Sequence, residues 1–195
     1  MLWARRSAAP VLDGMACSQG GGGLQAPCGT RRRGRWRIAR EVPMNHEKAV
    51  FFDAEAAAPW AVAPFGAEDQ PKIARLLAAA AIRPGAWVLE PGCGTGRVTT
   101  ILADAVGPDG RVIALDISQK MIEACRDRVG GRENVRVAQA AVEEYALAPE
   151  TVDVIVCHQV LPHFDDKPAA LAALVRVLKP LGRLLGAFPG SGGGQ

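Results

Sequence analysis

The sequence predicts an α/β fold in which helices cover both faces of a doubly wound, mostly parallel β-sheet. Three observations indicate this. Short apolar runs bounded by turn residues alternate with segments whose apolar residues recur at helical spacing. One run, 152–158, is apolar along most of its length, which is typical of a central parallel strand. A loop with three glycines, at 92–96, joins the first apolar run to the helix that follows it.

Capping residues at helix starts, and glycine or proline after helix ends, set the boundaries of the predicted elements. Helices are predicted over 69–83, 98–106, 118–130 and 166–178, the last one ending in the turn 179–182. Strands are predicted over 86–89, 111–116, 134–138, 152–158 and 183–188. Because a helix joins the first strand to the second, these two strands are expected to lie parallel and adjacent.

Charge is unevenly distributed along the 195 residues. Residues 1–43 carry eight Arg against Asp13 and Glu41, a net charge of +6, whereas 15 basic and 18 acidic residues give 44–195 a net charge of −3. A mildly acidic domain offers no basic face to a nucleic acid, so nucleic-acid binding is not expected. The longest apolar stretch, 76–82, is far shorter than the roughly 20 residues that cross a bilayer, so no membrane span is predicted either.

The five cysteines indicate neither a zinc site nor a disulfide framework, because their number is odd and no two form a Cys-x-x-Cys pair. Cys93, Cys125 and Cys157 stand in apolar or glycine-rich surroundings, which predicts small buried side chains. This usage fits a reducing, cytoplasmic location.

The first predicted strand ends at Glu90 and enters a loop with Gly92, Gly94 and Gly96. Glycines at alternate positions allow positive φ angles and the close approach of a ligand to the main chain. Free N–H groups and the positive end of the helix dipole favour an anionic ligand group, either a phosphate or a carboxylate.

The spacing of the glycines separates these two ligand classes. A dinucleotide fingerprint, Gly-x-Gly-x-x-Gly, needs a third glycine where Arg97 stands. Glu90 would repel phosphates but suits an ammonium or sulfonium group, and S-adenosyl-L-methionine carries both together with a carboxylate. Residues 90–96 resemble motif I of the class I S-adenosylmethionine-dependent methyltransferases, Glu/Asp-x-Gly-x-Gly-x-Gly. The alternative is a glycine turn that only packs a helix on a strand.

Asp116 ends the second predicted strand, 20 residues past Gly96. Ligands bind beyond the carboxyl ends of adjacent parallel strands, so Asp116 is expected to reach the same crevice as the glycine loop. There it can accept hydrogen bonds from both hydroxyls of a ribose. Proteins that bind nicotinamide cofactors and proteins that bind S-adenosylmethionine share this feature, so it does not distinguish the two classes.

The resemblance covers about 44–188 and is nearest to methyltransferases of ubiquinone and menaquinone biosynthesis. It rests on motif I, Asp116, the fourth strand and the Val-Leu-Lys-Pro sequence at 177–180, and it implies a Rossmann-like sheet with S-adenosyl-L-methionine as cofactor. The residues expected at the cofactor are Glu90, Gly92, Cys93, Gly94, Thr95, Gly96, Asp116, Ile117, Met121, Val142, Glu143, Cys157 and His158.

Adenine binding is expected to involve residues that follow the second and third strands. Ile117 and Met121 are expected to flank the ring, with core packing as the alternative for Met121. Family members commonly carry an acidic residue just after the third strand, where this chain has Ala141. Glu143, or the backbone of Val142, is the alternative partner for the ring.

His158 and His163 are weak catalytic candidates, because a histidine titrates near neutral pH. They follow the fourth strand, where the family's motif IV contacts the methionine part of the cofactor and faces the acceptor. A structural role is the alternative for each. The resemblance implies no obligatory catalytic residue and no metal, since methyl transfer depends mainly on holding the acceptor in line.

The segment 46–65 concentrates aromatic residues, among them Phe51, Phe52, Trp60 and Phe65. One interpretation is an N-terminal helix that packs on the core. The other, which the resemblance implies, is a lid over the cofactor cleft that gives an apolar wall to the acceptor site.

Both ends of the chain lie outside the predicted methyltransferase domain, 44–190. Residues 1–43 are expected to be a disordered basic extension: a transit peptide, a basic arm for nucleic acid or, the favoured interpretation, upstream sequence that is not part of the working protein. Residues 191–195 form a glycine-rich tail where the family continues with two further strands. We therefore expect either a sheet truncated after its fifth strand, with an open edge through which a homodimer could form, or a shortened coding sequence.

The sequence thus predicts a methyltransferase that moves a methyl group from S-adenosyl-L-methionine to a small, partly apolar acceptor molecule. A catalytically impaired S-adenosylmethionine-binding module, or a truncated remnant, is the first alternative. An NAD-dependent oxidoreductase is the second, and Arg97 and Glu90 disfavour it.

Overall fold

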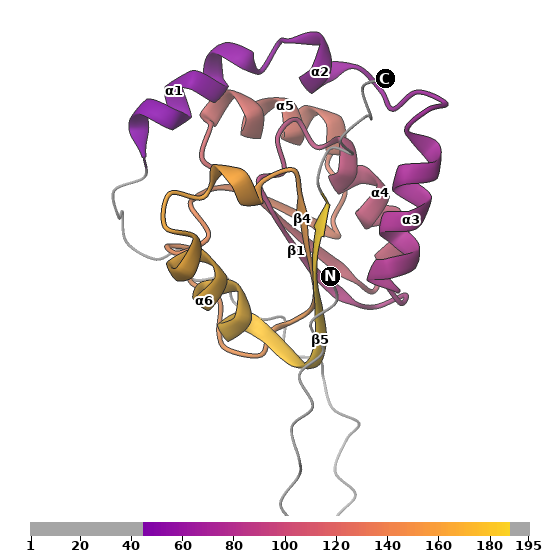
Figure 1. Ribbon diagram of the computed structural model, residues 1–195. Coiled ribbons are helices and arrows are strands. Elements are labelled where there is room, and N and C mark those ends of the chain that lie inside the picture. Colours follow the sequence, from indigo (N-terminus) through magenta and orange to yellow (C-terminus); the bar gives the residue numbers. More distant parts are fainter. Residues whose placement is uncertain (1–44, 188–195) are drawn as a thin grey trace, which may run out of the picture. The chain divides into compact units, whose positions relative to one another are not determined.

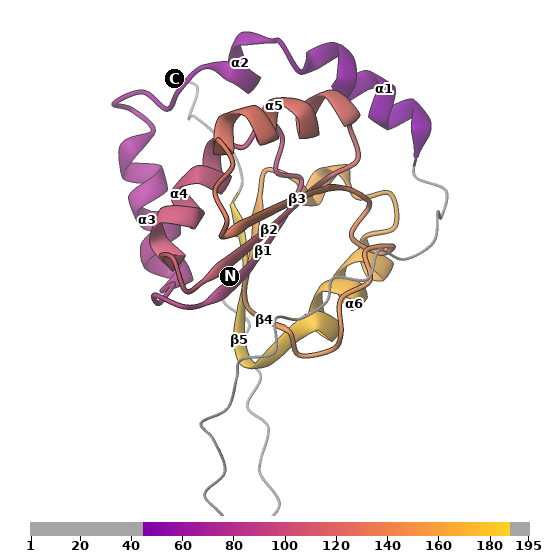
Figure 2. The same ribbon diagram turned by 180° about the vertical axis from the view of Figure 1, so that it is seen from behind.

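A computed structural model of the chain describes residues 45–187. The predicted N-terminal extension, 1–43, and the predicted glycine-rich tail, 191–195, lie outside the described residues. Within the described part, a five-stranded parallel sheet lies between helices on both of its faces (Figure 1, Figure 2). This arrangement confirms the predicted Rossmann-like fold class.

The sheet has the strand order β3-β2-β1-β4-β5, and every neighbouring pair is parallel. Its strands are β1 (Trp87–Pro91), β2 (Arg111–Asp116), β3 (Val135–Gln139), β4 (Val152–His158) and β5 (Leu178–Ala187). In the middle of the sheet, Leu89 pairs with Ile113 on one side and with Ile155 on the other. The strand order reverses between β1 and β4, and such sheets bind ligands beyond the carboxyl ends of the strands at this point.

The helices are α1 (His46–Glu55), α2 (Pro59–Val62), α3 (Gln70–Ala80), α4 (Arg97–Val106), α5 (Gln119–Val129) and α6 (Lys167–Val177), with a 3₁₀ turn, η1 (Leu161–His163). Side chains cap three of the helices: Asn45, Ser118 and Asp166 each accept a hydrogen bond from the backbone N–H three residues further on. None of the helices in the described part is long and apolar enough to cross a membrane.

The core lies on both faces of the sheet, because successive strand residues point to opposite sides. Val112 contributes to the cluster beneath α3 and α4, and Ala114 to the cluster beneath α5. Ile113 and Leu115 point the other way and pack against α6. Cys93, Cys125 and Cys157 are free, buried thiols within these layers, as the sequence predicts.

The start of the last strand differs from the prediction. Helix α6 ends at Val177, and β5 begins at once with Leu178, which pairs with Val152. The turn predicted at 179–182 is instead an irregularity within β5, after which Arg183 resumes the pairing opposite Val154. Leu178 already has extended backbone, with φ −79° and ψ 128°, and Pro180 disfavours helical backbone at Lys179, so the helix does not continue into 178–179.

Candidate functional site

A cavity of about 470 Å³ lies beyond the carboxyl ends of β1, β2 and β4. Its floor contains the glycine loop, and its opposite side is lined by residues from 45–65, the cover segment. Figure 1 shows α1 and α2 of this segment (indigo to purple) passing over α5. Small-molecule sites in proteins typically enclose roughly 300–1,000 Å³, so the cavity has the size of a ligand site.

The structure brings most of the predicted site residues together around this cavity. Those lining it are Glu90, Gly92, Cys93, Gly94, Thr95, Asp116, Ile117, Met121, Val142, Glu143, His158 and His163. Ala141 also lines the cavity, beside the predicted adenine partners. Cofactor binding by these residues stays a prediction.

Gly96 and Cys157 do not line the cavity. Gly96 begins α4 with a φ of 82°, and a Cβ there would lie 2.8 Å from the Cys125 sulfur, so it is a packing position between α4 and α5. Cys157 is fully buried against α6, and burial raises the pKa of its thiol to about 12. The alternation of side chains along β4 turns it away from the crevice.

The glycine loop is tight at one position and open at another. Gly92 and Gly94 have φ angles of 65° and 53°, a region that L side chains rarely adopt. A Cβ on Gly92 would lie 2.4 Å from Val160, whereas a Cβ on Gly94 would meet no atom within 4 Å. Gly94 therefore leaves open space beside the backbone of a cavity-lining loop, which fits the close approach of a ligand such as S-adenosyl-L-methionine.

Asp116 holds this loop from the end of β2. Its Oδ2 accepts a hydrogen bond from the Gly94 N–H at 2.9 Å, and its Oδ1 accepts one from the Ser118 N–H at 2.9 Å. Burial raises the pKa of the carboxyl group, although these backbone donors act in the opposite direction. A carboxylate has about four lone-pair sites, so both oxygens can still accept a hydrogen bond from a ligand hydroxyl.

Several amide groups of the loop are already engaged inside the protein. The N–H of Cys93 donates to the Leu115 carbonyl at 2.9 Å, and the N–H of Gly96 donates to the Cys93 carbonyl at 3.0 Å. With the Gly94 N–H bound to Asp116, three loop amides that could hold an anion have partners in the chain. This corrects the expectation that the loop offers free N–H groups at these positions.

Glu90 lies buried at the end of β1, with 1% of its surface exposed. Its Oε2 accepts a hydrogen bond from the Thr99 hydroxyl at 2.6 Å. Burial raises the pKa of this carboxyl group to about 8. A protonated Glu90 is neutral in the absence of a cationic partner, and an ammonium or sulfonium group in the cavity would favour its ionised form.

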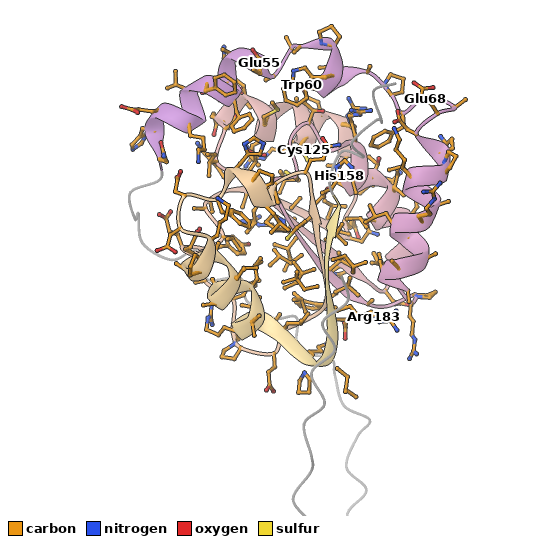
Figure 3. The ribbon with its side chains drawn as sticks, viewed as in Figure 1. Glu55, Trp60, Glu68, Cys125, His158 and Arg183 are labelled. Carbon is orange, nitrogen blue, oxygen red and sulfur yellow. The ribbon has the colours of Figure 1, made fainter. Side chains whose placement is uncertain are left out.

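Part of the cavity lining is an aromatic wall. It contains Phe52, Trp60 and Phe65 of the cover segment, together with Phe164 after β4. The Phe65 ring meets the His158 ring edge-on at 6.3 Å between centroids. His158 lies at the end of β4 below the cover segment that carries Trp60 (Figure 3). Burial, and to a smaller extent the charge of Arg97, lower the pKa of His158, so its imidazole is neutral at physiological pH.

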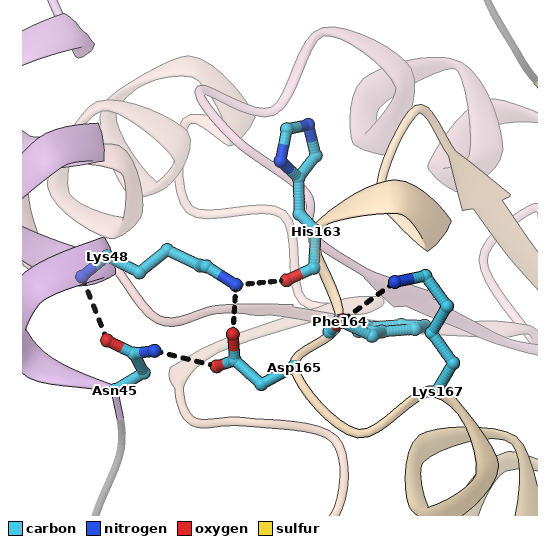
Figure 4. A network of polar contacts seen from close by, with 6 residues as sticks. All are labelled: Asn45, Lys48, His163, Phe164, Asp165 and Lys167. Atoms are coloured by element: carbon cyan, nitrogen blue, oxygen red, sulfur yellow. Dashed lines mark hydrogen bonds and ion pairs between the residues drawn. The ribbon is translucent and has the colours of Figure 1, made fainter.

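Polar contacts that the sequence did not indicate fix one end of the cover segment. Lys48 forms an ion pair with Asp165, and its Nζ also donates to the His163 carbonyl at 2.6 Å (Figure 4). The Asn45 amide donates to Asp165 at 2.9 Å. His163 is exposed, and its ring contacts Phe52 edge-on at 5.3 Å. These contacts join segments more than a hundred residues apart in the chain, for which the sequence carries no local signal.

The rest of the cover segment is fixed to the floor. Asp53 accepts hydrogen bonds from the Ser118 hydroxyl at 2.5 Å and from the Lys120 N–H at 3.0 Å, which hold its pKa below the usual value. The Trp60 carbonyl accepts a hydrogen bond from Arg97 at 2.6 Å, and the Val62 carbonyl accepts one from Arg128 at 2.9 Å.

A parallel sheet with a glycine loop and a carboxylate at the ends of two adjacent strands is typical of α/β domains that bind adenosine-containing ligands. Residues 89–186, half of the chain, match the family model described as a methyltransferase domain. The chain belongs to this family, and its fold is that of the class I S-adenosylmethionine-dependent methyltransferases, as the sequence predicts.

Two curated relatives match at similar levels. An uncharacterized 37.1 kDa protein in transposon TN4556 of Streptomyces fradiae is 41% identical over 53% of this chain and 30% of its own length. The ubiquinone/menaquinone biosynthesis C-methyltransferase UbiE of Teredinibacter turnerae is 41% identical over 53% of this chain and 43% of its own length. The chain therefore spans less than half of these relatives.

Solved structures agree on the fold. A methyltransferase from Aquifex aeolicus, described as SAM dependent, superposes with a TM-score of 0.54 and 23% identity, covering 71% of this chain and 69% of that one. At this identity the likeness concerns the fold alone.

Proposed function

We propose that residues 44–190 transfer a methyl group from S-adenosyl-L-methionine to a small, partly apolar acceptor. The observation that carries this proposal is a single cavity with two kinds of lining. The glycine loop and Asp116 supply the polar part, and the aromatic side chains of Phe52, Trp60 and Phe65 supply an apolar part. Membership of the methyltransferase domain family supports the same activity.

The chain would hold the cofactor with residues already at the cavity. Asp116 would accept hydrogen bonds from the ribose hydroxyls, and Ile117 and Val142 would contact the adenine ring. Ionised Glu90 would face the cationic methionine part. When bound, S-adenosyl-L-methionine supplies a methyl group activated by its sulfonium sulfur.

The other role of the protein would be to position the acceptor. The cover segment excludes water, and the aromatic wall orients an apolar acceptor, which can supply most of a rate enhancement for a displacement reaction. Neutral His158 would take up a proton from an acceptor that loses one. The relatives named for ubiquinone and menaquinone biosynthesis support an aromatic ring as the acceptor.

A second candidate is a module that binds S-adenosyl-L-methionine without turnover. Ala141, which lines the cavity in place of the acidic residue common in the family, favours it. Release of S-adenosylhomocysteine with a short-chain naphthohydroquinone as acceptor probe would support the enzyme. Binding of the cofactor with no release for any ring acceptor would support the module.

Titration calorimetry of the full chain with S-adenosyl-L-methionine tests whether this cofactor binds. Replacing Asp116→Asn should weaken binding by about tenfold or more, because a charge-assisted hydrogen bond contributes roughly 1.5–3 kcal/mol. Asp153→Asn is the matched control, since Asp153 also accepts a backbone hydrogen bond, from the Trp87 N–H at 2.8 Å, at the far end of β1. NAD should not bind. A folded protein that ignores S-adenosyl-L-methionine would overturn the proposal.

Self-association through β5 is a further part of the proposal. Within the described residues β5 pairs only with β4, and Leu181 on this strand is 92% exposed. An unpaired strand edge can join a second copy of the chain. Light scattering of the purified chain should report a dimer that Leu181→Lys weakens, and a monomer at all concentrations would contradict it.

A further inference from the structure

Two cationic side chains line the cavity, and they differ in their partners. Lys48 is neutralised by its ion pair with Asp165. Arg97, the first residue of α4, forms no ion pair among residues 45–187. The cavity therefore contains one guanidinium whose charge no carboxylate in the described part contacts directly.

The surroundings of Arg97 fix its side chain and leave one donor unused. Its Nη1 donates to the Trp60 carbonyl at 2.6 Å, and its guanidinium carbon lies 3.9 Å from the centroid of the Phe65 ring. Its Nε is buried and has no hydrogen-bond partner among the described residues. A buried donor without a partner is destabilising by about 1–3 kcal/mol, so an anion in the cavity that draws the guanidinium toward it would relieve this cost.

The neighbouring charges do not replace such a ligand. Asp69 is a carboxylate whose charge acts on Arg97, but its two oxygens accept from the Lys72 ammonium and the Gly66 N–H, both at 3.2 Å. Arg128 adds a second positive charge nearby and donates to the Thr95 and Val62 carbonyls. Asp69 therefore neutralises Arg97 only in part, and a ligand carboxylate beside the guanidinium would be attracted to it.

The loop amides point to the same conclusion. The N–H groups of Cys93, Gly94 and Gly96 have partners inside the chain, so they leave a carboxylate at this end of the cavity without those donors. The planar guanidinium of arginine matches a carboxylate better than any other side chain.

We propose that Arg97 is the carboxylate-binding residue of the cavity, an inference that rests on the proposed methyltransferase function. The carboxylate has two possible sources in that reaction: the methionine part of the cofactor, or the acceptor. Binding measurements with four probes and three variants separate these sources.

The first arm compares S-adenosylhomocysteine, which carries the carboxylate, with 5′-methylthioadenosine, which lacks it. If the cofactor is the source, Arg97→Gln weakens S-adenosylhomocysteine binding about tenfold or more and leaves 5′-methylthioadenosine unchanged. Arg97→Lys should recover part of the loss. Arg126→Gln removes the same charge from an exposed position on α5, at a residue outside the cavity lining, and should have little effect.

The second arm uses protein saturated with S-adenosylhomocysteine and compares 2-naphthoate with the neutral 2-naphthamide. If the acceptor is the source, the wild type prefers naphthoate by about tenfold. Arg97→Gln then abolishes this preference while S-adenosylhomocysteine binds as before.

Unchanged affinities in both arms, in a variant whose thermal unfolding matches the wild type, would overturn the role of Arg97. That result is distinct from failure of the proposed function, because 5′-methylthioadenosine and S-adenosylhomocysteine would still bind. A wild-type protein that binds neither nucleoside would overturn both proposals.

Discussion

The floor and the cover of the cavity are built in opposite ways. The floor is made of short segments at the ends of the strands, such as the one from Glu90 to Gly94 at the end of β1, and Glu90 and Ser118 within it are buried. The cover segment, 45–65, is held by polar contacts to distant residues and by one small apolar cluster with Met121, and it exposes Phe51 and Trp60 by 59% and 54%. A rigid floor fixes the ligand, and a cover with few buried contacts can open at a low free-energy cost.

The comparison predicts that substitutions in the floor change the free energy of unfolding more than substitutions in the cover do. Among them, Glu90→Gln should have the largest effect. Glu90 has a pKa of about 8 in the folded protein against 4.5 normally, so the folded state keeps a proton that the unfolded state loses. Because the folded state binds this proton more tightly, the free energy of unfolding falls as pH rises from about 5 to about 8. The decrease that Glu90 causes is roughly 4 kcal/mol at most. The Gln variant keeps the Thr99 contact and should be as stable as wild type at pH 5 and more stable at pH 8.

Urea unfolding of both proteins at pH 5, 6.5 and 8 measures this difference. Parallel pH profiles for the two proteins would show that Glu90 is ionised in the folded state, and the floor would then be more polar than its burial indicates.

Replacing Gly96→Val should produce the next largest effect. The new side chain would collide with Cys125 on α5, and overpacking of this kind is destabilising by about 1–3 kcal/mol. Gly130→Val is the matched control, because Gly130 has a similar φ of 61° but open space around its Cα, so it isolates the collision from the backbone strain. The measurement is the free energy of unfolding of the two variants, and equal losses would contradict a tightly packed floor.

The smallest effect is expected in the cover. Lys48→Met removes the ion pair with Asp165 and the bond to the His163 carbonyl, both partly exposed, and should lower global stability by less than about 1 kcal/mol. Local opening should nevertheless increase, so limited proteolysis within 45–65 should accelerate by about fivefold. Glu47→Gln, on the same helix and without a polar contact of its side chain among the described residues, should leave the cleavage rate near the wild-type value. An unchanged rate in Lys48→Met would mean that apolar contacts alone hold the cover.

Sequence patterns identified the floor because its chemistry is local. The strand 111–116 and the Ser118 cap coincide with the structure, and Asp116 reaches the glycine loop as expected. The binding role of the site residues stays a prediction. The aromatic content of the cover segment was visible, but its place over the cavity depended on the resemblance to a family.

The sequence by itself determined the fold class, the parallel strands, the glycine loop and the acidic residue at the end of β2. These depend on periodicity, capping and backbone conformation, which act between residues near in the chain. Only the tertiary structure decided that the loop amides have internal partners, that Cys157 faces the core, and that Arg97 keeps a buried donor at the cavity. Those properties arise where distant segments pack together, because burial and hydrogen-bond partners are set by the neighbours that folding brings into contact.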